Sequence, residues 1–148
     1  MLRPFVESDT DNLVRLWLDS ARTSHAFLPQ GVWDSMEEDI RSLYLPMSEE
    51  ILLHIDDASG EIDAFLAFAG DYLGALFVAP QAQGRGLGTR MFRIARRMHP
   101  DLTLTVYKDN GLAVAFYEKQ GLSVLDERVE EKTSCVELIM GFRPADKS

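Results

Sequence analysis

The sequence predicts an α+β fold in which about four helices flank a mixed, mostly antiparallel β-sheet. Two observations carry this prediction. In the first half of the chain, apolar runs are separated by short, turn-rich segments, which is typical of hairpins and therefore of antiparallel pairing. In the second half, strand-like and helix-like runs alternate, and two strands connected through a helix pair in parallel. Because the chain has 148 residues, 46% of them apolar, we expect one domain over residues 1–148, with a frayed tail at 143–148.

The N-terminal segment predicts a short strand followed by a helix. The strand runs from Leu2 to Val6, and Pro4 is tolerated there only near the strand start or at a sheet edge. Asp9 and Thr10 have side chains that can cap a helix. Apolar residues then recur at helical spacing and form one face of this helix, namely Leu13, Leu16, Trp17 and Ala21.

A second helix and three strands are expected next. Pro29 and Gly31 interrupt the helical pattern, which resumes from Trp33 to Leu43. Proline does not continue a regular helix, so this helix should end before Pro46. The strand-like runs that follow are Ile51–Ile55, Ile62–Phe68 and Tyr72–Val78, and the first two are joined by the turn-rich segment Asp56–Gly60.

A glycine-rich segment follows the third strand and leads directly into a helix. It reads Gln83-Gly84-Arg85-Gly86-Leu87-Gly88. A helix N-terminus carries unpaired backbone N–H groups with partial positive charge, and glycine lets an anion approach them without a Cβ in the way. The segment therefore predicts a pyrophosphate-binding loop, although its spacing matches neither the dinucleotide fingerprint nor the P-loop. The helix has Arg90, Arg93 and Arg97 on one side, and its apolar side consists of Leu87, Met91, Ile94, Ala95 and Met98.

The C-terminal part of the chain predicts another strand and helix and then two closing strands. The strand Leu102–Val106 lies between two helices in the sequence, which is the crossover pattern of parallel pairing. The next helix opens at Asn110. The last strands are expected at Leu122–Leu125 and Cys135–Phe142, with the charged segment Asp126–Lys132 connecting them.

Two motifs together resemble those of the GCN5-related N-acetyltransferases. The first is the glycine segment, which has the form Gln-x-x-Gly-x-Gly of that family's acetyl-CoA pyrophosphate loop. The second runs from Asn110 to Leu122 and looks like the family's Asn-x-x-Ala-x-x-Phe-Tyr-x-x-x-Gly-Phe segment, with Leu122 in place of the usual phenylalanine. The motifs occur in the family's order with a strand between them, and a weaker resemblance extends over most of the chain.

The resemblance implies a splayed pair of parallel strands and a reaction at that splay. The enzyme would move an acetyl group from acetyl-CoA to a primary amine by direct attack in a ternary complex. The acceptor would be a small molecule, a protein lysine or a protein N-terminus. The backbone N–H of Phe77 or Val78 would donate to the thioester oxygen. The residues implied to bind acetyl-CoA are Leu76, Phe77, Val78, Gln83, Gly84, Arg85, Gly86, Leu87, Gly88, Thr89, Asn110 and Tyr117.

Tyr117 is implied as the general acid that protonates the leaving thiolate of coenzyme A. A phenol, with a pKa of about 10, is close enough to a thiol in acidity to serve. A buried tyrosine more often packs as a core aromatic, here beside Phe116, and only the motif favours the catalytic role. Asn110 likewise has two roles open, as the N-cap of its helix and as a partner of the cofactor arm.

The sequence leaves the general base open between two residues. Asp71 precedes the strand Tyr72–Val78, and an aspartate at a strand end is more commonly a turn former. His25 lies where the family has its acceptor-binding loop, and an unperturbed pKa near 6.5 suits proton acceptance, although a surface histidine is the commoner outcome. The residues implied to bind the amine are His25, Tyr44 and Tyr72.

Charge is distributed unevenly along the chain. The net charge of −9 argues against a general nucleic-acid surface. No Asp or Glu occurs from Tyr72 to Pro100, whereas five arginines do: Arg85, Arg90, Arg93, Arg96 and Arg97. This region would attract the phosphates of coenzyme A, and the alternative is a solvated arginine face. The acidic remainder of the chain would favour cationic amines as acceptors.

The remaining features exclude several classes of protein. Cys135 is the only cysteine, so no intrachain disulfide forms, and a buried, inert thiol is expected. The histidines lack metal-ligand spacing, and no metal is expected. The absence of a long apolar run or an apolar N-terminus predicts a cytoplasmic protein without a membrane partner. A homodimer stays open, and the competing function is a catalytically silent sensory domain that binds coenzyme A or acyl-CoA.

Overall fold

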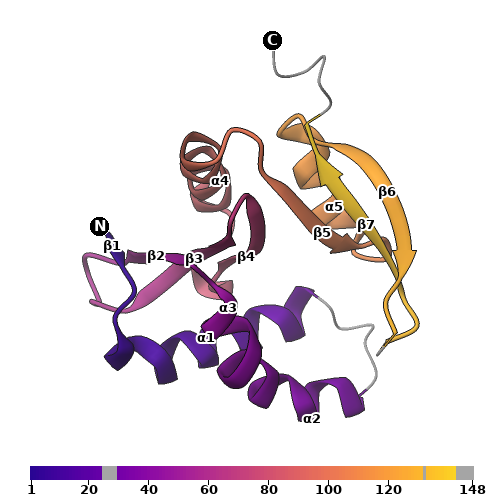
Figure 1. The fold of residues 1–148 in the computed structure, drawn as a ribbon. Helices are drawn as coiled ribbons and strands as arrows, with labels where there is room; N and C mark the ends of the chain where they lie inside the picture. Colours follow the sequence, from indigo (N-terminus) through magenta and orange to yellow (C-terminus); the bar gives the residue numbers. More distant parts are fainter. Residues whose placement is uncertain (25–29, 132, 143–148) are drawn as a thin grey trace.

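The computed structural model describes residues 1–24, 30–131 and 133–142, with the side chains of residues 20–34 outside the description. It contains a seven-stranded sheet in the order β1-β2-β3-β4-β5-β7-β6, flanked by helices (Figure 1). All neighbouring strands are antiparallel except β4 and β5. The predicted α+β fold is thereby confirmed. The strands are β1 (Leu2–Pro4), β2 (Glu50–Ile55), β3 (Ile62–Ala69), β4 (Tyr72–Val78), β5 (Thr103–Tyr107), β6 (Ser123–Val129) and β7 (Val136–Gly141).

The helices cover both faces of the sheet, with α1 and α2 on one face and α4 and α5 on the other (Figure 1). The main helices are α1 (Thr10–Ser24), α2 (Gln30–Asp39), α4 (Leu87–Met98) and α5 (Gly111–Lys119). The short ones are η1 (Glu7–Asp9), η2 (Ile40–Tyr44), α3 (Leu45–Met47) and η3 (Pro80–Ala82). Alternate residues of β3 supply the two cores, because Phe65 packs on the α1 side and Phe68 on the α4 side.

A partly buried ion pair fixes the start of α1. The guanidinium of Arg3 donates two hydrogen bonds of 2.8 Å to the carboxylate of Asp9, which also accepts the Val6 N–H at 2.9 Å. The Arg3 bond, and then the Val6 bond, hold the pKa of Asp9 below its ordinary value against the opposing effect of burial. The expected capping role of Asp9 therefore includes tying β1 to the helix, whose residues Leu13 and Trp17 are buried against the sheet.

The second helical segment differs from the prediction at its end. It continues from α2 through the π-helical turn η2 into α3, and Pro46 lies inside α3 rather than beyond the helix. The π turn explains the difference. The Leu45 N–H bonds to the Ile40 carbonyl, five residues back, so the regular ladder that Pro46 would break has already ended. The chain leaves the helix at Ser48.

The parallel pair β4–β5 is joined at one end only. Its paired residues are Tyr72 with Thr103 and Leu73 with Leu104, and β4 continues to Val78 without further pairing to β5 in the described chain. A register shift in the β3–β4 ladder leaves Gly74 as an extra residue. A bulge of this kind bends the strand that contains it. The bend at Gly74 lies where β4 leaves β5, and the predicted splay is confirmed.

The end of the chain contains a longer strand than expected. Asp126–Val129 belong to β6, whereas the sequence predicted them as part of a charged connection. The strand lies at the edge of the sheet, and its residues from Leu125 onward are exposed on both faces. Alternating burial, the usual strand signal, is therefore missing from this segment. Charged side chains are tolerated there because both of its faces remain in water.

Candidate active site

The glycine loop ends at the N-terminus of α4, where the first backbone N–H groups of the helix are free. Gly84 and Gly86 have φ values of 82° and 76°, in the left-handed region that favours glycine. Gly86 is the N-cap residue, no side chain caps the helix, and the first intrahelical bond runs from the Arg90 N–H to the Gly86 carbonyl at 3.0 Å. The N–H groups of Leu87, Gly88 and Thr89 consequently have no acceptor within the helix. This geometry suits an anion at the loop.

Gln83 connects the loop to the end of β4. Its side-chain amide donates to the Val78 carbonyl at 3.1 Å. The predicted cofactor residue thus forms a structural hydrogen bond, which holds the loop beside the end of β4 that is not paired with β5. The free N–H groups of α4 and the splayed strands are in this way held next to one another.

The backbone of β4 directs alternate N–H groups toward the gap. The Ala79 N–H bonds to the Asp63 carbonyl of the β3 side at 2.8 Å. Since N–H directions alternate along a strand, the N–H of Phe77 also faces β3, and those of Leu76 and Val78 face the splay. The ring of Phe77 turns to the α1 face, 6.1 Å from the ring of Trp17. Of the two expected oxyanion donors, Val78 is therefore the one whose N–H faces the gap.

Tyr117 lies on α5, packed against α4. Its ring centroid is 6.0 Å from that of Phe92 and 5.2 Å from that of Phe116. Burial raises the pKa of its phenol to about 12. The ring of Tyr117 therefore makes the core contacts that the sequence predicted. Its hydroxyl oxygen has no hydrogen-bond partner among the described residues.

Asn110 is the N-cap of α5. Its side-chain oxygen accepts the Ala113 N–H at 3.3 Å. The capping role proposed from the sequence is confirmed. The helix that carries Tyr117 thus starts at a position set by Asn110, immediately after β5.

Asp71 is held away from the splayed end by an ion pair. Its carboxylate lies 2.9 Å from His99 Nδ1, and His99 Nε2 lies 2.6 Å from a carboxylate oxygen of Glu50. Asp71 comes directly before the end of β4 that is paired with β5. Its carbonyl belongs to that pairing, because it accepts the Thr103 N–H at 3.1 Å. The structure brings Asp71 together with His99 and Glu50, and not with Tyr117 or the glycine loop.

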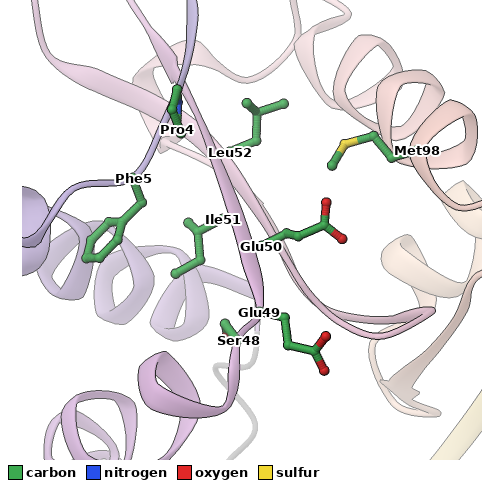
Figure 2. Close-up of a pocket in the computed structure, with 8 residues that line it drawn as sticks. All are labelled: Pro4, Phe5, Ser48, Glu49, Glu50, Ile51, Leu52 and Met98. Atoms are coloured by element: carbon green, nitrogen blue, oxygen red, sulfur yellow. The ribbon is translucent and has the colours of Figure 1, made fainter.

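A groove beside this cluster is separate from the site. Its volume is about 390 Å³. Figure 2 shows the Glu50 carboxylate on the side of the groove where Met98 of α4 lies. The lining residues are Pro4, Phe5, Ser48, Glu49, Glu50, Ile51, Leu52 and Met98. None of them was predicted to bind cofactor or acceptor.

The aromatic residues expected at the acceptor side lie on the α1 face. Tyr72 is 40% exposed, and its ring lies 3.8 Å from where a Cβ on Gly74 would stand, beside the bulge. Tyr44 ends the π turn, and its ring stacks on that of Trp17 at 6.0 Å. His25 lies outside the described residues. The bulge at Gly74 was missed, although a glycine inside a strand pattern is a recognised sign of a bulge.

The arginines of the predicted cationic region are all exposed, and one of them also packs on an aromatic ring. Arg96 lies over the Phe142 ring, 4.3 Å from its centroid. Arg90, Arg93 and Arg97 are exposed, and no ion pair involves them in the described part of the chain. In the described residues there is neither a group of three metal-binding side chains nor a helix long and apolar enough to cross a membrane. Cys135 is half-buried, with its Sγ 3.6 Å from the Thr133 carbonyl.

Comparisons with known proteins agree with the fold and with the motifs. The family model described as the acetyltransferase (GNAT) domain matches residues 20–136. The peptidyl-lysine N-acetyltransferase YiaC of Escherichia coli is 30% identical over 143 residues, covering 96% of each chain. The peptidyl-lysine N-acetyltransferase YjaB of Escherichia coli is 31% identical over 114 residues, covering 77% of this chain and 76% of YjaB.

Solved structures show the same arrangement of elements. The solution structure of apo YjaB from Escherichia coli has a TM-score of 0.84 and 26% identity, covering 96% of each chain. The PaiA N-acetyltransferase from Thermoplasma acidophilum, solved in complex with coenzyme A, has a TM-score of 0.74 at 16% identity, covering 97% of this chain and 98% of that one. The second likeness concerns the fold alone.

Proposed function

Because this chain belongs to the GNAT acetyltransferase family, we propose that it is a peptidyl-lysine N-acetyltransferase that takes its acetyl group from acetyl-CoA. The observation that supports the donor most directly is the glycine loop beside the splayed strands. The left-handed Gly84 and Gly86 leave the first N–H groups of α4 free, and no acidic residue occurs from Tyr72 to Pro100. A pyrophosphate fits these groups by charge and by hydrogen bonding.

The proposed donor site continues from the loop along β4. The N–H groups of Leu76 and Val78 face the gap, and that of Leu76 would bond to the pantetheine arm, whose amides need partners of this kind. Arg85, Arg90 and Thr89 lie at the loop and the first turn of α4, where cations and free donors suit phosphate oxygens. Gln83 and Asn110 contribute by holding the loop and α5 in place.

When bound, acetyl-CoA supplies an acyl carbon joined to a sulfur leaving group. The N–H of Val78 donates a hydrogen bond to the thioester oxygen and stabilises the negative charge that develops there. Tyr117 donates its phenolic proton to the departing sulfur. A phenol with a pKa of about 12 is protonated at neutral pH, so it holds a proton that it can give to the departing sulfur.

The acceptor side rests on Tyr44, Tyr72 and His25. Tyr72 is exposed next to the bulge, on the opposite face of β4 from Leu73, so its ring can lie along the alkyl chain and ammonium group of an incoming lysine. Asp71 is bonded to His99 at the paired end of the strands, which argues against it as the base. His25 therefore remains the candidate that accepts the proton of the lysine, directly or through water.

A peptide-acetylation assay tests the proposal. The protein is incubated with acetyl-CoA and an N-terminally blocked peptide that contains one lysine, and mass spectrometry locates the added acetyl group. The control peptide has arginine in place of the lysine, and parallel reactions contain spermidine or an aminoglycoside. Acetylation of the lysine Nε alone is the expected result. Acetylation of only the small amines would overturn the acceptor, and coenzyme A binding without turnover would indicate a silent sensory domain.

A further inference from the structure

His54 and Asp63 form a mostly buried pair where β2 turns into β3. His54 Nδ1 lies 2.6 Å from the Asp63 carboxylate, and the two side chains are only 11% and 14% exposed. An ionised carboxylate accepts hydrogen bonds and does not donate them, so Nδ1 is the donor. A carboxylate removed from water in this way depends on its bond, because burial without a partner costs free energy. Neither residue belongs to the donor or acceptor site described above.

Asp63 is the extra residue of a β-bulge. His54 pairs with Ala64 in the β2–β3 ladder. The next pair joins Ile55 to Ile62, so Asp63 has no partner on β2. The extra residue of a bulge lacks the ladder bonds of its neighbours, and other contacts have to fix its conformation. The bond from His54 to the Asp63 side chain is such a contact, and it ties the bulge to β2.

The backbone of this bulge residue holds the end of β4. The Asp63 carbonyl accepts the Ala79 N–H at 2.8 Å, and Ala79 directly follows Val78. Phe77, directly before Val78, is paired with β3. The Val78 carbonyl accepts the side-chain amide of Gln83 at 3.1 Å. Val78 is therefore held by β3 on both sides along the chain and by Gln83 at its carbonyl, while its N–H faces the gap between β4 and β5.

We propose that His54 is a positioning residue for acetyl transfer. Its bond to the Asp63 side chain holds the bulge, the bulge carbonyl holds Ala79, and this bond keeps the Val78 N–H aimed at the thioester oxygen. The inference rests on the proposed function, in which that N–H stabilises the developing negative charge. Such a donor is effective because it is held in place before the reaction, and a misplacement of about 1 Å can cost about 10²-fold in rate.

Two substitutions of His54 test the role of the bond. His54→Asn keeps a side-chain N–H that can reach the Asp63 carboxylate, whereas His54→Leu has no donor. We expect His54→Leu to lower kcat for the lysine peptide about tenfold or more, with the KM values for acetyl-CoA and peptide within about twofold of wild type. His54→Asn should recover most of the lost kcat. An equal loss in both variants, or a change in KM alone, would contradict a positioning role.

Two further variants separate this role from a general loss of stability. His99→Leu is the matched control, because it removes a histidine that bonds a carboxylate at the opposite end of β4, beside Asp71. Its kcat should equal that of the wild type. Asp63→Ala removes the other partner of the bond, so combining it with His54→Leu should cost about as much as either change alone. Losses that multiply, or a control that is equally slow, would refute the assignment.

Hydrogen exchange tests the support of β4 in the absence of any substrate. In His54→Leu the Ala79 N–H should exchange about tenfold faster than in the wild type, because its acceptor is no longer held. The reference is the Thr103 N–H, which bonds to the Asp71 carbonyl at 3.1 Å at the other end of β4 and should exchange at an unchanged rate. This result does not depend on which amine is the acceptor. Equal acceleration of both amides, or none at Ala79, would overturn the proposal.

Discussion

The imidazole of His99 lies with Nδ1 2.9 Å from the Asp71 carboxylate, and its other nitrogen lies 2.6 Å from Glu50. Two ring nitrogens that both face carboxylates are both donors, which is the protonated form of histidine. Asp71 first, and then Glu50, raise the pKa of His99, while its partial burial opposes them. One side chain thereby joins the C-terminus of α4 to the turn before β4 and to β2.

Stability should depend on pH through this histidine. The pKa of His99 is higher in the folded protein than in the unfolded chain, where it is near 6.5. The stabilisation that its ion pairs provide is therefore fully present below pH 6.5 and is lost as the pH rises through the pKa of the folded state. We expect His99→Asn to remove this dependence and to cost about 0.5–1 kcal/mol at pH 6, since both carboxylates are largely exposed. Urea unfolding at pH 6 and pH 8.5 measures it. An identical pH slope in the variant would contradict the assignment.

Replacing Gly86 with glutamate should abolish coenzyme A binding. The variant places a negative charge at the N-terminus of α4 and a side chain on a residue with φ of 76°. Gly70→Glu is the matched control, because Gly70 has φ of 60°, open space around its Cβ position and a place before β4 rather than after it. Calorimetric titration should show binding for the control and none for Gly86→Glu. Equal affinities would move the pyrophosphate away from the loop.

Tyr117→Phe should lower kcat by on the order of 10²-fold and leave acetyl-CoA affinity largely unchanged. The ring contacts with Phe92 and Phe116 are kept, and only the proton donor is lost. Because the pKa of Tyr117 is raised to about 12, the wild-type rate should show no fall from its ionisation between pH 7 and 9. Steady-state kinetics of both proteins across this range provide the measurement. An unchanged kcat would return Tyr117 to a packing role.

Tyr72→Ala should raise KM for a lysine peptide about two- to fivefold, the loss expected for one exposed cation–π contact of about 0.5–1 kcal/mol. Tyr72→Phe keeps the aromatic face and should behave like the wild type. His25→Ala should instead lower kcat for the peptide, most strongly above a pH of about 6.5, where a histidine base is neutral and can accept the proton of the amine. In all three variants the KM for acetyl-CoA should stay constant, and a change confined to acetyl-CoA would place these residues on the donor side.

Local signals made much of this fold predictable from the sequence. The glycine loop, the cap at Asn110 and the amphipathic α4 each depend on residues within one or two turns of one another. The cluster of His99, Asp71 and Glu50 joins residues 28 and 49 positions apart, so no local pattern reports it. The strand at Asp126–Val129 was missed for another reason, because both of its faces are exposed and the alternating pattern of a half-buried strand is absent. The π turn was missed because Pro46 alone suggested where the helix ends, whereas the turn ends the regular ladder before Pro46.

The strand order has a consequence for how the chain folds as it is synthesised. In the first half of the sheet, β2, β3 and β4 follow one another closely in the sequence, and β1 pairs with β2. This half can therefore assemble as soon as β4 has left the ribosome. β5 has only two paired positions on β4, and its full ladder is formed with β7, which inserts between β5 and β6. The second half of the sheet therefore cannot form until Val136–Gly141, the residues of β7, have been synthesised. A nascent chain that ends before them contains β5 and β6 without the strand that pairs with both.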